Sequence, residues 1–301
     1  MSCTGSDIDD SRRAERIWSA LACPSCGHCL DQNGPFYCAH CGIPYSFIGD
    51  ALVFADNPSA YMARLSSGHT NPYTKKAVAL IEDDSDAWIL DFGAGNPSPD
   101  QRYANVLRLD AVHLPASDVV STYERLPFKE ASFDAVVSES VFEHLRDPTG
   151  IAAELWRILK PGGRLLVDTA FMQPYHADPD HYFNMTIAGL RVVFSRFTEV
   201  AAGFGSHQTP GTTLNLLVRT FAGLISASEL RQSLLERFAL DFREFDAHID
   251  LSQGHIMAAG VWFAGIKGER DGLMAHEQEM TRFRDLLTAN DAGVTIPKPR
   301  A

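Results

Sequence analysis

The stretch that decides the fold is Trp88-Ile-Leu-Asp91-Phe-Gly93-Ala-Gly95. Its apolar start predicts a buried parallel strand, and its glycines predict a turn at the carboxyl end of that strand, where open α/β sheets bind ligands. Without Cβ atoms, Gly93 and Gly95 let backbone amides approach a ligand closely. Asp91 adds a carboxylate, and Asp110 follows a second apolar run at the position of a ribose-binding acid. These residues predict a nucleotide-cofactor site, and on their own they fit nicotinamide-dependent enzymes equally well.

The sequence after Asp110 predicts alternating strands and helices. Phe133 to Val137 is a short apolar run typical of a buried strand. Asp147-Pro148 then provides an N-cap and a first helical residue, and Pro161-Gly162-Gly163 ends the helix before a strand at Arg164 to Asp168. This order predicts a doubly wound, mostly parallel α/β sheet, and Ile256 to Ile266 is expected to add an antiparallel last strand. Pro97 and Pro99 leave little room for a helix before Asp110.

In this order, the glycine loop, Asp110, Leu126-Pro-Phe128, Glu143-His144 and Leu159-Lys-Pro-Gly-Gly163 resemble class I S-adenosylmethionine-dependent methyltransferases of the ubiquinone-biosynthesis-like, type 11 group. The resemblance implies a Rossmann-like fold and S-adenosylmethionine as the cofactor. It implies cofactor contacts by Asp91, Gly93, Gly95, Asp110, Ser138 and Glu139, and an adenine contact by Thr122 and Tyr123. On the alternative interpretation, Thr122 and Tyr123 simply end a strand.

All 6 cysteines lie at or before Cys41, which is unlike a disulfide framework spread over a secreted fold. Cys23-Pro-Ser-Cys26-Gly27 and Cys38-Ala-His-Cys41-Gly42 form two Cys-x-x-Cys knuckles. Four thiolates at this spacing predict a closed tetrahedral Zn²⁺ site, and a closed site is structural because it has no open coordination position. A redox dithiol or chance clustering remains the alternative.

The segment around these cysteines resembles the zinc-ribbon activator subunit of tRNA and release-factor methyltransferases. It is also similar to the N-terminal ribbon of certain ribosomal RNA guanine methyltransferases, over about the first sixth of the chain. The resemblance implies contact with a substrate or a protein partner through the ribbon.

The acceptor site is expected in Phe171 to Thr186, because this segment leaves the carboxyl end of a central strand. The segment is similar to a methyltransferase branch found in glycan and natural-product biosynthesis, although Asn184 stands where that branch has arginine. If the acceptor must lose a proton, His176 is the first candidate base and His181 the second, since a histidine pKa lies near neutrality. The alternative for each is a structural hydrogen-bonding role.

A formal net charge of -12 and an acidic pI near 5.3 disfavour nucleic acid as the substrate, which a basic face would attract. No apolar run reaches membrane-spanning length, and we expect a cytoplasmic enzyme. The predicted organisation is a flexible N-terminus (1–19), a zinc ribbon (20–56), a linker (57–73), a methyltransferase domain (74–268) with a helical insertion at about 212–240, and a C-terminal helix and tail (269–301), with the tail after Asp291 disordered. The insertion's apolar stripe indicates a core or lid contact, with a homodimer or membrane-surface contact as the alternative.

Three functions follow from these observations. The first is a methyltransferase that acts on an O or N atom of a small-molecule or glycan-type acceptor. The second is an RNA methyltransferase that contacts its substrate through the ribbon. The third is a binding protein whose methyltransferase fold has lost efficient catalysis, which the departure at Pro97 suggests.

Overall fold

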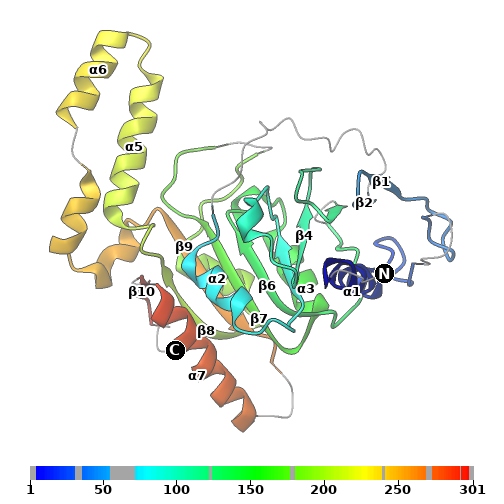
Figure 1. Cartoon of the computed structure of the whole chain (residues 1–301). Coiled ribbons are helices and arrows are strands. Elements are labelled where there is room, and N and C mark those ends of the chain that lie inside the picture. The colour runs from blue at the N-terminus through cyan, green and yellow to red at the C-terminus, as the bar shows by residue number, and fades with distance from the viewer. Residues whose placement is uncertain are drawn as a thin grey trace.

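The computed structural model describes residues 5–30, 36–54, 72–121, 124–176, 180–238, 241–268, 273–291 and 293–297. Their strands form one ten-stranded sheet in the order β1-β2-β5-β4-β3-β6-β7-β9-β8-β10 (Figure 1). The strands are β1 (Ser46–Ile48), β2 (Ala51–Phe54), β3 (Ile89–Phe92), β4 (Val106–Asp110), β5 (Val119–Ser121), β6 (Phe133–Glu139), β7 (Leu159–Ala170), β8 (Thr198–Phe204), β9 (Gly260–Ile266) and β10 (Val294–Thr295). The strands from β2 to β7 run parallel, and β9 is antiparallel to both β7 and β8. The predicted Rossmann-like, mostly parallel α/β sheet is therefore confirmed.

Helices cover both faces of this sheet and create two hydrophobic cores. Side chains of α1 (Gly5–Ala20), α3 (Pro148–Ile158) and α4 (Ile187–Val193) pack on one face. Side chains of α2 (Lys75–Glu82) and α7 (Leu273–Asn290) pack on the other, where Phe283 and Leu287 are fully buried. The result is a three-layer arrangement of the kind that buries a parallel sheet on both sides.

Local sequence signals explain the central βαβ unit. Asp147 caps α3 by accepting a hydrogen bond from the Gly150 amide, and Pro148 occupies the first turn. Between β3 and β4 the two prolines leave only a 3₁₀ turn, η2 (Pro99–Gln101), as the sequence predicts. The carboxyl ends of β3, β4 and β6 consequently lie next to one another with short loops above them.

The ribbon is continuous with the main sheet. Its hairpin β1–β2 joins the sheet because β2 pairs in parallel with β5, with Val53 opposite Val120. Phe54 contacts the ribbon rings Phe36 and Tyr45 and belongs to the same core cluster as Phe128. The predicted ribbon, expected to end at residue 56, thus shares one hydrophobic core with the main sheet.

Both ends of the described chain are ordered, which corrects two expectations. The N-terminal segment expected to be flexible contains α1, where Arg13 donates a hydrogen bond to Asp118 at 2.6 Å and Arg16 lies over the Trp88 ring. After Asp291, where disorder is expected, β10 pairs antiparallel with β8. Long-range partners of this kind are invisible to local sequence patterns.

The helical insertion is an arm that projects away from the sheet (Figure 1). It consists of α5 (Pro210–Leu224), α6 (Ser228–Arg237), and the 3₁₀ segments η4 (Phe242–His248) and η5 (Leu251–Ile256). Several apolar side chains on it are exposed, including Phe221, Leu224 and Leu230. Among the described residues, no helix has both the length and the apolar character needed to cross a membrane.

Because Phe54 joins the ribbon to the common core, we expect Phe54→Ala to lower the free energy of unfolding by about 3–5 kcal/mol. Urea unfolding should remain a single transition when followed by far-ultraviolet circular dichroism and by intrinsic fluorescence. Phe47→Ala, at a half-exposed ring on the adjacent strand, is the matched control and should cost much less. An early, separate ribbon transition would contradict the shared core.

Candidate functional site

The glycine loop after β3 adopts backbone angles that other residues rarely take. Gly93 has a φ of 78° and Gly95 a φ of 60°, both in the left-handed region. The amides of Gly93 and Ala94 donate to the Leu109 carbonyl at 2.9 and 3.1 Å. These two amides therefore hold β3 against β4, whereas the sequence analysis expects the loop amides to face a ligand.

Gly93 is also required by close packing. A Cβ atom built at this position would lie 2.2 Å from Cγ2 of Val141, which follows β6. The absence of a side chain at Gly93 thus lets the loop after β3 pack directly against the chain leaving β6.

Asp110 lies at the end of β4 with its carboxylate turned to the glycine loop. The Gly95 amide donates to Oδ2 at 2.8 Å and the Val112 amide donates to Oδ1 at 3.2 Å. These two amide hydrogen bonds fix the orientation of the carboxylate at the end of β4. This geometry fits the ribose of a nucleoside cofactor.

Two carboxylates at neighbouring strand ends are covered by residues that sequence reasoning missed. Tyr73 donates its hydroxyl to Asp91, and Thr74 donates its amide and its hydroxyl to Glu139. Thr74 also caps α2, so one short segment positions the helix and both acids. The only sequence signal for these contacts is that threonine is a common N-cap residue.

The pKa of Asp91 is raised to about 7: burial is the largest cause and the charges of Glu139 and Asp110 add to it, against the lowering effect of the Tyr73 hydrogen bond. Burial likewise raises the pKa of Glu139. Perturbed carboxylates of this kind are typical of binding sites for charged ligands.

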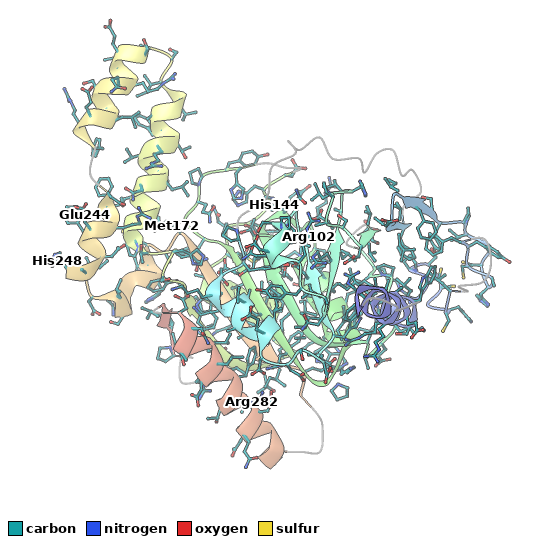
Figure 2. The ribbon with its side chains drawn as sticks, in the orientation of Figure 1. Arg102, His144, Met172, Glu244, His248 and Arg282 are labelled. Carbon is teal, nitrogen blue, oxygen red and sulfur yellow. The ribbon has the colours of Figure 1, made fainter. Side chains whose placement is uncertain are left out.

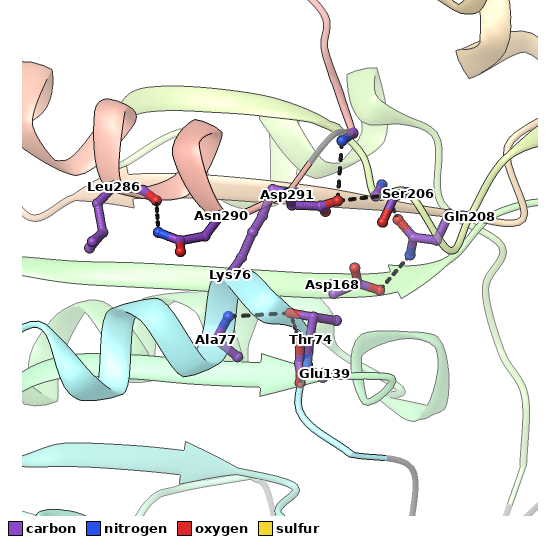
Figure 3. A network of polar contacts seen from close by, with 12 residues as sticks. Thr74, Lys76, Ala77, Glu139, Asp168, Ser206, Gln208, Leu286, Asn290 and Asp291 are labelled. Carbon is purple, nitrogen blue, oxygen red and sulfur yellow. Dashed lines mark hydrogen bonds and ion pairs between the residues drawn. The ribbon is translucent and has the colours of Figure 1, made fainter. Parts of the chain in front are cut away.

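Asp168 adds a third buried carboxylate at the end of β7, and burial raises its pKa well above the usual range. Gln208 donates to Asp168 at 2.7 Å. Figure 3 shows Lys76 of α2 extending to Asp291, close to this pair, and Lys76 and Asp291 form a buried ion pair. The C-terminal end of α7 is thereby tied to the helix that begins at the cofactor side.

Two serines at the end of β6 are unusual, one in its hydrogen bonding and the other in its backbone conformation. Ser138 has no exposed surface, and its hydroxyl has no hydrogen-bond partner among the described residues. Ser140 has a φ of 57°, which is unusual for a residue other than glycine and is frequent at functional sites. Thr122 and Tyr123 lie outside the described residues.

A second group of side chains lies beyond β6 and β7. Glu143 is 1% exposed, and Oε1 of Glu143 lies 4.0 Å from Nε2 of His176. His144 and His176 meet edge to face at 5.1 Å between ring centres, and His181 lies 4.4 Å from His176. Figure 2 shows His144 on the sheet side of the molecule, well separated from Glu244 and His248 on the arm. The structure thus brings both predicted histidines together and adds Glu143 and His144.

His181 has both ring nitrogens engaged within its own loop. Its Nδ1 accepts the His176 amide at 3.3 Å, and its Nε2 lies 3.1 Å from the Phe183 carbonyl and 3.1 Å from Oδ1 of Asn184. Since both of the latter oxygens accept, Nε2 carries the hydrogen. These contacts fit a role in holding the backbone of His176.

The four knuckle cysteines converge as the sequence predicts. Sγ atoms of Cys23 and Cys41 are 3.6 Å apart, and those of Cys26 and Cys38 are 3.5 Å apart. All four lie within 4.8 Å of one another. Sulfur atoms at these separations fit tetrahedral Zn²⁺ with bonds of about 2.3 Å, and the Tyr45 hydroxyl lies 3.0 Å from Cys23 Sγ in the surrounding shell.

A family model described as a methyltransferase domain matches residues 92–167. Residues 92–167 thus match a methyltransferase domain. The match includes Gly93, Gly95 and Asp110, and it ends before His176 and His181.

Similar proteins share parts of this domain. A demethylmenaquinone methyltransferase of Deinococcus radiodurans is 51% identical over 43 residues, which are 14% of this chain and 18% of the relative. A tRNA U34 carboxymethyltransferase of Cellvibrio japonicus is 31% identical over 114 residues, which are 31% of this chain and 35% of the relative. The phosphoethanolamine N-methyltransferase 2 structure of Haemonchus contortus has a TM-score of 0.42 and 15% identity, covering 65% of this chain and 52% of that one. The chain therefore spans well under two thirds of these relatives.

Gly93→Ala in the methyltransferase domain combines a backbone penalty with a clash against Val141, so we expect a larger loss of stability than for Gly162→Ala. Gly162 has a similar φ of 76° with nothing near its absent Cβ, and its replacement should cost about 1–2 kcal/mol. Val141→Ala in the Gly93→Ala background should recover part of the difference. Denaturant unfolding measures all three variants, and equal costs for Gly93→Ala and Gly162→Ala would contradict the close packing.

Proposed function

We propose that this protein transfers the methyl group of S-adenosylmethionine to an O or N atom of a small-molecule or glycan-type acceptor. The observation that carries the proposal is the adjacency of the two groups at the carboxyl edge of the sheet. Val141 packs on the glycine loop, and Glu143, two residues later, begins the histidine cluster. A donor held by the first group and an acceptor held by the second would be neighbours.

On the cofactor side, we assign the ribose hydroxyls to Asp110 and the adenine edge to Thr122 and Tyr123. Asp91 and Glu139 supply negative charge for the cofactor's ammonium group, Gly93 and Gly95 shape the loop, and Ser138 offers its unpartnered hydroxyl. The bound cofactor supplies a methyl group already activated on a sulfonium. The protein's contribution is then to align the acceptor and exclude water.

On the acceptor side, three aromatic rings surround the histidines. Tyr175 is 69% exposed, and Tyr182 and Phe183 are 38% and 41% exposed. Exposed rings this close together are unusual on a protein surface and suit stacking against a sugar or another flat ring. The net charge of -12 would disfavour the phosphates of RNA.

Within the cluster we assign His176 to the reacting atom and His181 to positioning. His176 is partly exposed and lies against Glu143, so an acceptor proton can leave at this place. His181 holds the amide of His176 and stacks with Tyr175 at 6.0 Å.

We also propose that Cys23, Cys26, Cys38 and Cys41 bind a structural Zn²⁺ that organises the ribbon. The ribbon or the arm is then the surface for a protein partner or a second copy of the chain. Thiolates held for metal binding fit a reducing compartment such as the cytoplasm.

Cofactor affinity should rise with pH between 6 and 8. Above the pKa of about 7, Asp91 is ionised and attracts the cofactor's ammonium group, and below it the neutral acid does not. Asp91→Asn should weaken binding about tenfold at pH 8 and flatten this dependence, as measured by calorimetry with S-adenosylmethionine. Asp134→Asn, which removes an ion pair with Lys160 at the opposite end of β6, is the control. No cofactor binding in the unaltered chain would favour a fold that has lost catalysis.

A labelled-methyl transfer screen over sugars, small aromatic compounds, lipids and RNA tests the acceptor. With an active acceptor, His176→Ala should lower turnover by about a hundredfold or more, while cofactor affinity stays the same. His181→Ala should cause a smaller loss. Transfer to RNA with an affinity that falls steeply with salt would instead support the RNA alternative.

A further inference from the structure

Glu143, His144 and His176 form a group of three metal-ligand side chains outside the cysteine knuckles. One ligand atom from each of them lies within 4.8 Å of the others. Glu143 and His144 are in η3 (Phe142–His144), and His176 comes from the loop after β7. Two separate elements therefore bring the Glu143 carboxylate and two imidazoles close together.

The hydrogen bonds of the two histidines fix which nitrogen is free. Nδ1 of His144 lies 2.6 Å from the Asp180 carbonyl, and Nδ1 of His176 lies 3.1 Å from the Pro174 carbonyl. A carbonyl oxygen only accepts, so each Nδ1 carries the hydrogen, and in the neutral ring each Nε2 keeps its lone pair. Backbone carbonyls hold metal-binding histidines in this tautomer.

A hydrogen bond also fixes the orientation of the Glu143 carboxylate. Thr169 donates its hydroxyl to Oε2 at 2.7 Å, while Oε1 faces Nε2 of His176 at 4.0 Å. A lone pair that faces a buried carboxylate is unfavourable unless a cation lies between them. Two ligand atoms on the same side of an ion, with bonds of about 2.0–2.1 Å, lie about 2.9–3.4 Å apart, so the 4.0 Å separation is somewhat longer than a bound ion requires.

We propose that Glu143, His144 and His176 bind a divalent transition-metal ion at the acceptor site. Two histidines and one carboxylate on one side of an ion leave open positions on the other. These positions suit an acceptor with adjacent oxygen atoms, as in a sugar or an aromatic diol. To reach bonding distance, the His176 ring needs to approach Glu143 by about 0.6–1 Å.

This inference rests on the proposed function and specifies its acceptor step. The ion lowers the pKa of a bound acceptor hydroxyl, whose proton passes to water. The resulting oxygen forms a bond to the methyl carbon as the carbon–sulfur bond breaks, which leaves S-adenosylhomocysteine and the methyl ether. In this site His176 acts on the acceptor through the ion, as a metal ligand, and this replaces its assignment above as the direct base.

Binding of Mn²⁺ to the full-length protein tests the site, because this ion prefers oxygen and nitrogen ligands and discriminates against the cysteine knuckles. Loss of the free Mn²⁺ electron paramagnetic resonance signal should give one site per chain. His144→Ala and His176→Ala should each weaken binding at least tenfold, as should Glu143→Gln provided that its circular dichroism is unchanged. His255→Ala, at a partly exposed histidine of η5, should bind normally.

Activity separates this inference from the proposed function. Chelation followed by return of Mn²⁺ should remove and restore methyl transfer, with cofactor affinity unchanged. Transfer that survives chelation, without Mn²⁺ binding, would overturn the metal site and leave the methyltransferase proposal intact. Mn²⁺ binding that His144→Ala abolishes, in a protein that methylates none of the screened acceptors, would support the site and count against the proposed function.

Discussion

Burial of several carboxylates at one edge of the sheet is the constraint on which the surrounding structure depends. Parallel strands end side by side, so Asp91, Glu139 and Asp168 meet where little water can reach them. Like charges in such a place are costly unless donors or cations compensate them. Tyr73, Thr74 and Gln208 supply donors to these acids.

This constraint explains why segments distant in sequence converge there. The residues that enter α2 bond to Asp91 and Glu139, and Lys76 in its first turn pairs with Asp291 near the C-terminus. Asp291 also accepts the Ser206 amide and so connects the start of the arm with this pair. Through these contacts, the strand ends at Asp91 and Glu139 are connected to the C-terminal end of α7 and to the base of the arm.

The sequence predicts what depends on local patterns. The glycine loop, the capped helix α3, the shortened helix at Pro97 and the four cysteines all have short-range signatures that the structure reproduces. The partners of these elements were not predictable in the same way. Tyr73 lies in no motif, and the Glu143-His144 motif carries no sign of its contact with His176. The places of β2 and β10 depend on strands far along the chain.

Those two edge strands also give the N- and C-terminal segments a common role. A parallel sheet that ended at β5 and β8 would expose unpaired backbone groups that attract other chains. The hairpin β1–β2 covers the first edge and β10 covers the second. A metal bound by the four cysteines would therefore influence the end of β4, since β2 pairs with β5 and β5 pairs with β4 at Asp110.

The raised pKa values set a direction for the effect of pH on this arrangement. A carboxyl whose pKa is higher in the folded chain than in the unfolded chain favours folding at low pH, and this contribution disappears as pH rises through the folded value. For Asp91 that loss runs from the ordinary pKa of 3.8 up to about pH 7, and the ionised group then adds a negative charge beside Glu139 and Asp110. A cationic ligand relieves this repulsion in the same pH range. The ionised form of Asp91, which would best attract the positive charges of the proposed cofactor, is thus the form that stabilises the fold less.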